Sequence, residues 1–357
     1  MGECIFTRRE AKIKKLPVLN GNYPTDATTW HGEQATFSVA ISEAGVPDEY
    51  TYQWYRDGSI WTGASHPTVS WHSASIGSHS IYCIVTNKAG SVRSRTATLT
   101  VKDPAMYYSY TGTAEKIDDG NGNWRIKLKT SGVFRFTSLG NWNGLIDVFC
   151  VGGGCAGGGG TNGQWNAGGG YGKAGSGGYT TTQKNVQAAA NVSYNIVIGA
   201  GGQSTFASGG NTYAFDVAAG GGTKLGGGSG GGAYGNTEVN NGGSDGGNGD
   251  PQDAANIGID HPASPGRGQG RTTREFGEPT GTLYAGGGGA GGNGSRQAVG
   301  GAGGGGNGGW SGVYPNTPPS DGTANTGGGG GGYMYVYSGT QRVGKGGSGI
   351  VVIRNHR

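Results

Sequence analysis

Apolar and polar residues alternate with a period of two in short segments of the first 102 residues. The alternating segments are 32–41, 50–58, 81–87 and 97–101. Such alternation is typical of strands that bury one face, and the Asp57-Gly58 pair favours a hairpin turn. The pattern predicts an all-β unit over residues 17–102, preceded by a short N-terminal segment, 1–16, and followed by a linker, 103–113.

The same alternation returns in the rest of the chain. The further strand-like segments are 124–129, 132–137, 144–151, 179–186, 192–198 and 349–354. The last of them follows a long glycine-rich stretch, and a flexible tether would not need an apolar strand to close it. We therefore expect one ordered domain over 114–357, in which a β-sandwich base holds the two ends of the glycine-rich stretch.

Glycine composition divides the chain near residue 110. Glycine accounts for 83 of the 357 residues, and only 8 of these glycines lie in residues 1–110. The runs keep no strict Gly-X-Y register and contain few prolines, which excludes collagen. Two alternatives remain, a disordered low-complexity linker and a packed bundle of extended glycine-rich helices. The bracketing strands favour the bundle.

Residues 17–102 resemble an immunoglobulin-like domain. Trp54 takes the place of the core tryptophan on the third strand, and Cys83 takes that of the second disulfide cysteine. Val39 stands where the first cysteine belongs, so the bridge cannot form, and we expect Cys83 to be a small buried hydrophobe. Such a module serves as a spacer or as a binding unit, and the spacer role is favoured here.

Residues 131–357 resemble the glycine-rich tail proteins of bacteriophages, akin to the adhesins at the tips of T-even tail fibres. The resemblance is carried, in order, by 146–154, 177–180, 198–202, 272–278, 283–287 and 346–353. It implies a polyglycine-II bundle that carries receptor-contacting loops, in a protein of the virion tail or otherwise of an extracellular surface. Residues 4–9 are similar to the N-termini of some tail proteins, so we expect residues 1–16 to attach to other virion tail proteins.

Aromatic, asparagine and proline residues interrupt the glycine runs. Rigid aromatic rings mixed with serine, glycine and asparagine are typical of recognition loops. The expected receptor-binding residues are Trp165, Asn166, Tyr234, Trp310, Tyr314, Tyr333, Tyr335 and Tyr337. Their expected partner is a bacterial surface glycan or an outer protein. Two other classes remain open: a structural tail spacer or decoration protein without receptor binding, and an ice-binding protein.

Charge and candidate chemistry argue against other classes. The formal net charge is +4, and most of it lies in residues 1–15, so no basic face for nucleic acid is expected. No apolar run is long enough for a secretory signal or a membrane span. The two G-x-S-x-G matches, one around Ser229, arise by chance in glycine runs and lack the strand, helix and histidine of a nucleophile elbow. We expect no catalysis, cofactor or metal.

Two further expectations concern polar and thiol groups. Arg274 and Glu275 are adjacent in sequence and are expected to be structural, as a buried ion pair. The four cysteines lack the spacing of a metal site. A bridge between Cys150 and Cys155 is left open, and free thiols, as in a protein made in a reducing cytoplasm, are favoured.

Overall fold

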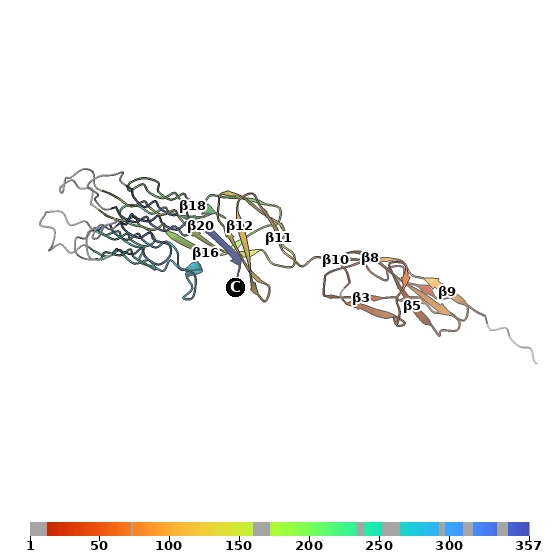
Figure 1. Ribbon diagram of the computed structural model, residues 1–357. Helices are drawn as coiled ribbons and strands as arrows, with labels where there is room; N and C mark the ends of the chain where they lie inside the picture. The colour runs from red at the N-terminus through yellow and green to blue at the C-terminus, as the bar shows by residue number, and fades with distance from the viewer. Residues whose placement is uncertain are drawn as a thin grey trace, which may run out of the picture. The chain divides into compact units, whose positions relative to one another are not determined.

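The computed structural model describes residues 13–72, 74–159, 172–233, 239–251, 265–292, 297–309, 317–333 and 342–356. The chain divides into two compact units, Met1–Met106 with Leu139–Trp142, and Tyr107–Ser138 with Asn143–Arg357. Strands dominate both units (Figure 1), so the predicted all-β class is confirmed. Within the described ranges, no helix has the length and apolarity to cross a membrane.

The first unit contains ten strands. They are β1 (Val18–Leu19), β2 (Ala27–Trp30), β3 (Gln34–Ser38), β4 (Ile41–Glu43), β5 (Thr51–Arg56), β6 (Ser59–Ile60), β7 (Thr68–His72), β8 (Gly77–Asn87), β9 (Gly90–Arg93) and β10 (Ala97–Lys102). The largest sheet has the order β2-β10-β8-β5-β6, with β9 also paired to β8, while β3 pairs with β7 and β1 with β4. Only β2 and β10 run parallel among these pairs.

Buried apolar residues from these sheets form the core of the first unit. Trp54 is fully buried, and its indole N–H donates to the carbonyl oxygen of His66 at 2.7 Å. Cys83 and Val39 belong to the same core cluster, and Cys83 is a free thiol. The segment 32–41 forms two strands instead of one, because β3 pairs with β7 whereas β4 pairs with β1.

The second unit is built on two larger sheets. Its elements are β11 (Tyr107–Tyr110), β12 (Ala114–Gly120), β13 (Asn123–Leu128), β14 (Gly132–Ser138), β15 (Leu145–Val151), β16 (Thr180–Gln187), β17 (Ser193–Ile196), β18 (Thr212–Ala214), β19 (Val217–Ala219), the 3-10 turn η2 (Glu275–Gly277) and β20 (Ile350–Asn355). One sheet has the order β12-β13-β20-β15-β16 and another the order β11-β14-β17, while β18 pairs with β19.

The predicted linker 103–113 needs correction. Residues 107–110 form β11, which pairs antiparallel with β14, and the ring of Tyr108 stacks on that of Phe134 at 5.2 Å between centroids. The segment Tyr-Tyr-Ser-Tyr has no clear apolar alternation, so its pairing partner, and not its own pattern, makes it a strand. The second unit therefore begins at Tyr107.

The C-terminal strand β20 occupies the centre of the five-stranded sheet. It pairs antiparallel with β13 on one side and with β15 on the other. Its residues Ile350–Ile353 are buried on both faces, which explains their continuous apolar run, since a strand covered on both faces has no solvent side to alternate with. The chain thus enters the glycine-rich region from β15 and returns through the neighbouring β20.

The glycine-rich region is a bundle of extended segments joined by backbone hydrogen bonds. In residues 152–158, successive N–H groups donate in rotation to three different neighbouring segments. The first neighbouring segment accepts at the carbonyl oxygens of Tyr179, Ser176 and Lys173, from the N–H groups of Gly152, Cys155 and Gly158. The second accepts at Gly210 and Ala207, from Gly153 and Ala156. The third accepts at Gly347 and Gly344, from Gly154 and Gly157. Residues 286–292 repeat the same period of three with their own neighbours.

Close backbone approach explains why these positions are glycine. A Cβ added to Gly154 would lie 2.0 Å from the carbonyl oxygen of Gly328, and one added to Gly157 would lie 2.0 Å from that of Gly331. Because such contacts lie far inside van der Waals separation, any side chain would force two segments apart and lengthen several hydrogen bonds. The interior of the bundle is therefore packed backbone against backbone.

We expect Gly157→Ala to destabilise the second unit by about 3 kcal/mol, because the new methyl group overpacks a rigid backbone contact. This corresponds to a fall of roughly 6–12 °C in the Tm of that unit, measured calorimetrically on the full chain. Gly220→Ala is the control, since its Cβ would meet only ordinary contacts, the nearest at 3.4 Å. Equal Tm values for the two variants would contradict backbone packing at Gly157.

The buried thiols Cys83, Cys150 and Cys155 are all unpaired, and burial raises the pKa of each to about 12. At pH 8 only roughly one thiol in ten thousand is then ionised, and the thiolate is the reactive form. In a Cys4→Ser variant we expect almost no labelling by iodoacetamide in the native protein and three labels after unfolding in urea. Rapid native labelling would show that a thiol is accessible.

Candidate functional site

Segments of the bundle meet at the end opposite the five-stranded sheet. Gly158 lies seven residues beyond the end of β15, a distance of at most roughly 23–25 Å along an extended chain. Its N–H donates to Lys173 at 2.8 Å, and its carbonyl oxygen accepts from Tyr333 at 2.9 Å. Figure 1 shows these extended segments running side by side away from β16 and β20.

The same end gathers the residues that flank the undescribed connections. Gly291 donates to Gly172, Gly292 donates to Gly309, and Gly309 donates to Gly332. Ala233 donates to Asp250, and Ala290 donates to Asn240. These residues stand next to the connections 160–171, 234–238, 252–264, 293–296, 310–316 and 334–341. The described residues on the two sides of these connections therefore lie at this end of the bundle.

Most of the expected receptor-binding residues lie outside the described residues. They are Trp165, Asn166, Tyr234, Trp310, Tyr314, Tyr335 and Tyr337. Tyr333 is described and is only 5% exposed. Its ring lies against Gly159, where an added Cβ would come within 3.0 Å of it. Tyr333 therefore packs inside the bundle, and the receptor contact expected for it is corrected to a structural one.

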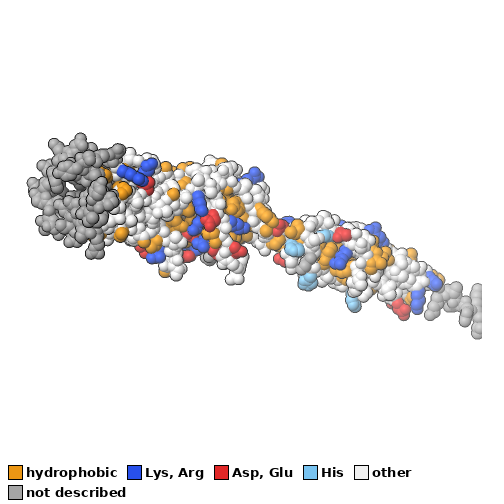
Figure 2. Space-filling model, in the orientation of Figure 1, with side chains coloured by type: hydrophobic (Ala, Val, Ile, Leu, Met, Phe, Trp, Pro, Cys, Tyr) orange, Lys and Arg blue, Asp and Glu red, His pale blue; other side chains and the backbone are white. Residues whose placement is uncertain are grey.

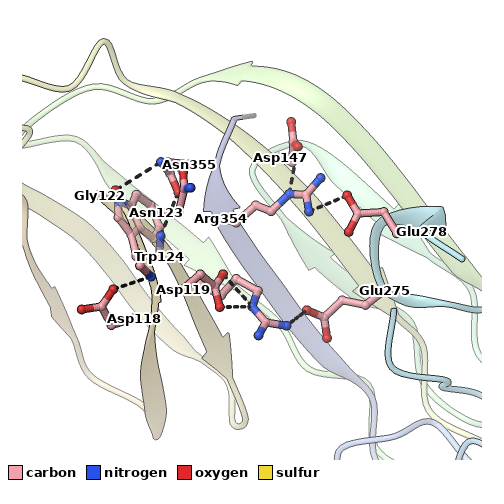
Figure 3. A network of polar contacts seen from close by, with 12 residues as sticks. Asp118, Asp119, Gly122, Asn123, Trp124, Asp147, Glu275, Glu278, Arg354 and Asn355 are labelled. Atoms are coloured by element: carbon pink, nitrogen blue, oxygen red, sulfur yellow. Dashed lines mark hydrogen bonds and ion pairs between the residues drawn. The ribbon is translucent and has the colours of Figure 1, made fainter. Parts of the chain in front are cut away.

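A polar network fastens the glycine-rich region to the sheet at the other end (Figure 3). Glu275 in η2 is 2% exposed and accepts from Arg125 of β13 at 2.7 Å and from the hydroxyl of Tyr284 at 3.0 Å. Arg125 also pairs with Asp119 at 2.9 Å. Burial and the contact with Glu275 raise the pKa of Tyr284, so its hydroxyl stays a hydrogen-bond donor.

The expected ion pair between Arg274 and Glu275 is therefore wrong. Arg274 instead approaches Asp245, with 3.3 Å between Nε and Oδ2, near the surface. Arg274 has extended backbone angles and immediately precedes η2, of which Glu275 is the first residue. Glu275 contacts Arg125 of the sheet, whereas Arg274 contacts Asp245.

A second, more deeply buried part of the network centres on Arg354 of β20. Its Nε lies 3.1 Å from Asp147 of β15, its Nη1 lies 2.7 Å from Glu278, and its guanidinium stacks 4.1 Å from the ring centroid of Phe276. Asp147 also contacts His356 at 2.7 Å. Asp147 and Arg354 are paired residues of neighbouring strands.

The sequence contained a signal for this pair. Asp147 and Arg354 each place one charge in an otherwise apolar strand segment, and the charges are opposite. A buried charge is tolerated only with a partner. The presence of Asp147 in one strand therefore indicated that an opposite charge, such as that of Arg354, lies next to it. Each guanidinium group of the network is shared by two carboxylates, and the contacts of Glu275 and Glu278 join η2 and the residue after it to strands of the sheet. In the described part of the chain, no cluster of three His, Cys, Asp or Glu side chains could hold a metal ion.

Removing the charge of Glu275 should destabilise the second unit strongly. We expect Glu275→Gln to lower the free energy of unfolding by roughly 3 kcal/mol, because Arg125 and Tyr284 lose a buried anionic acceptor. Arg274→Gln, which removes a pair near the surface, should cost less than about 1 kcal/mol. Urea unfolding of the two variants measures the difference in unfolding free energy. Similar losses of unfolding free energy would show that the buried contact of Glu275 stabilises the protein no more than the surface pair of Arg274.

Among the solved structures that are similar to the chain are two whose similarity is weak. One is to a quinonprotein alcohol dehydrogenase-like protein from Bacteroides thetaiotaomicron, with 17% identity and a TM-score of 0.21, over 35% of this chain and 38% of that chain. The other is to carbohydrate-binding modules of the β-sandwich superfamily, with 13% identity and a TM-score of 0.19, over 51% of this chain and 82% of that chain. Both TM-scores are too low to support an argument about fold or function.

Comparison with sequences is more specific. No curated protein matches the chain. The model of the glycine-rich domain family, however, matches residues 129–356. The match begins just before β14 and runs through the whole bundle to the end of β20, so it covers most of the second unit. The chain belongs to the glycine-rich domain family.

Proposed function

We propose that this protein is a bacteriophage tail or tail-fibre adhesin that recognises a bacterial surface receptor without catalysis. In this proposal the bundle is polyglycine II, a helix with three residues per turn and no internal hydrogen bonds. The rotation of the donors in residues 152–158 among three neighbours supports this, because a period of three directs every third N–H to the same side.

The observation that carries the receptor role is the convergence of chain connections at one end of the bundle. At this end of the bundle, the described residues that flank the six connections are hydrogen-bonded to one another or lie next to residues that are. The connections contain Trp165, Trp310, Tyr314 and Tyr335. A rigid scaffold that presents several aromatic-containing connections together is typical of recognition surfaces. The proposed partner is a bacterial surface glycan or an outer protein.

The other parts take supporting roles in the proposal. Residues 1–16 attach the protein to other tail proteins, and the first unit, interpreted as immunoglobulin-like, acts as a spacer. On the face seen in Figure 2, basic and acidic side chains are interspersed along the described part of the second unit. Such a mixed surface does not favour the phosphate backbone of a nucleic acid, so we propose that nucleic acid is not a partner.

The alternative is a structural spacer or decoration protein of the tail. The observation that supports this alternative is the buried network at Glu275 and Arg354, because ion pairs between the sheet and η2 would stiffen the second unit. A spacer would need rigidity and no receptor contact. Cell binding by the purified chain separates the two functions.

To test the proposal, the fluorescently labelled full chain is mixed with a panel of bacterial strains, and bound protein is quantified by flow cytometry. We expect binding to particular strains, and at least a tenfold loss of affinity for one or more of Trp165→Ala, Trp310→Ala, Tyr314→Ala and Tyr335→Ala. Tyr213→Ala, an exposed aromatic residue of β18 near the sheets, is the control. Retained binding in all four variants would refute recognition by these residues.

A further inference from the structure

A histidine of the first unit is held between two hydrogen-bond acceptors. His79 lies near the start of β8, and its side chain is only 11% exposed. Its Nδ1 lies 2.8 Å from Oδ2 of Asp57, and its Nε2 lies 2.7 Å from the carbonyl oxygen of Ser75. Neither an ionised carboxylate nor a carbonyl oxygen can donate a hydrogen bond. Both ring nitrogens must therefore carry a proton, which makes the ring an imidazolium ion.

The backbone fixes Asp57 as the anionic partner. Asp57 begins the turn between β5 and β6 with a φ of 48°, and Gly58 follows with a φ of 78°, as a tight hairpin turn requires. The N–H of Asp57 donates to the carbonyl oxygen of Ser80 at 2.9 Å, and its Oδ1 accepts from the N–H of Ser80 at 2.9 Å. Burial would raise the pKa of Asp57, but the hydrogen bonds from His79 and Ser80 lower it overall. The carboxylate is thus ionised at neutral pH and directed at His79.

An aromatic ring and a second cation complete the surroundings of His79. The ring of Trp71 in β7 meets the imidazole edge to face, with 4.9 Å between centroids. Arg56, at the end of β5, places its guanidinium 5.0 Å from the centroid of the same indole ring. Asp57 and Arg56 are thus the charges that the neighbouring strand contributes here. Burial would lower the pKa of His79, but the hydrogen bonds to Asp57 and Ser75 and the charge of Asp57 raise it overall.

Ser75 offers a different contact to a neutral ring. Its hydroxyl oxygen lies 3.3 Å from the same Nε2, and a hydroxyl group can donate to an unprotonated nitrogen, whereas a carbonyl group cannot. Loss of the Nε2 proton would therefore replace the short contact with the carbonyl oxygen by one with the hydroxyl group, which requires residues 74–76 to shift. A second titratable side chain touches this segment, since Nδ1 of His31 lies 2.9 Å from the carbonyl oxygen of Ala74.

Asp57, His79 and Ser75 have the residue types of a nucleophilic triad, but not its hydrogen bonding. In a triad, an unprotonated Nε2 accepts the proton of the serine hydroxyl group. Here Nε2 lies closer to the carbonyl oxygen of Ser75 than to its hydroxyl oxygen. Nε2 therefore holds a proton and cannot act as the base. The arrangement suits a pH-dependent contact and not catalysis.

We propose that His79 is a pH-sensitive latch, which in its protonated form fastens residues 74–76 to the turn between β5 and β6. The folded unit holds this proton more tightly than the unfolded chain does. The latch therefore stabilises the first unit fully below the ordinary histidine pKa of about 6.5, and the stabilisation is lost as the pH rises through the raised pKa. The latch does not depend on the receptor function proposed above, because its residues all lie in the first unit.

Nitrogen-15 NMR of the histidine rings in the full chain tests the protonation directly, with the signals of His79 assigned by their loss in His79→Gln. We expect both ring nitrogens of His79 to be protonated at neutral pH, with a titration midpoint above about 6.5. Asp57→Asn should lower that midpoint, because it removes the charge that favours the imidazolium ion. A neutral ring at neutral pH, or a midpoint at or below the ordinary value, would overturn the proposal.

Urea unfolding, followed at amide NMR signals of the first unit, tests whether the proton stabilises that unit. We expect the urea midpoint of the wild type to fall between about pH 6 and about pH 8.5, and His79→Gln to lose at least about half of that fall. His72→Gln, which changes an exposed histidine of β7, is the control and should keep the fall. If His79→Gln does not fold, Asp57→Asn takes its place and should also reduce the fall. Equal pH dependence in the wild type and the latch variant would overturn the latch.

Discussion

Hydrogen bonding between extended backbones in direct contact is the interaction on which the second unit depends. N–H groups of residues 152–158 donate to three neighbours in turn, and this requires separations at which a Cβ on Gly154 or Gly157 would overlap a carbonyl oxygen. Glycine loses much conformational entropy on folding and buries no side chain. Satisfied backbone groups and dense contact must offset that loss. The glycine content is therefore a packing requirement.

A bundle made of backbone has few side chains with which to fix its own register, so the register is set where it meets the sheets. β15 and β20 are adjacent strands, and they carry the two ends of the glycine-rich region. Phe276 and Tyr284 pack on Phe149 of β15. The pairs of Glu275 with Arg125 and of Arg354 with Asp147 add directional contacts in the same place. Side-chain chemistry thus holds the bundle from one end.

The opposite end of the bundle holds the described residues that flank the chain connections. Described residues that flank the chain connections are hydrogen-bonded neighbours there, and a longer connection costs little additional entropy. Under the proposed function, recognition residues in the connections can therefore change while the glycine packing of the described bundle stays the same.

The sequence by itself determined the all-β class, the position of most strands and the return of the glycine-rich region to a closing strand, because alternation and apolar runs are local signals. It did not reveal β11, whose residues become a strand only through pairing with β14. It also paired Glu275 with its sequence neighbour Arg274, although the partner is Arg125, 150 positions away. Runs of glycine carry no side-chain pattern, so only the tertiary structure could decide which segments lie together and which charges meet. Those choices depend on contacts between residues far apart in the chain.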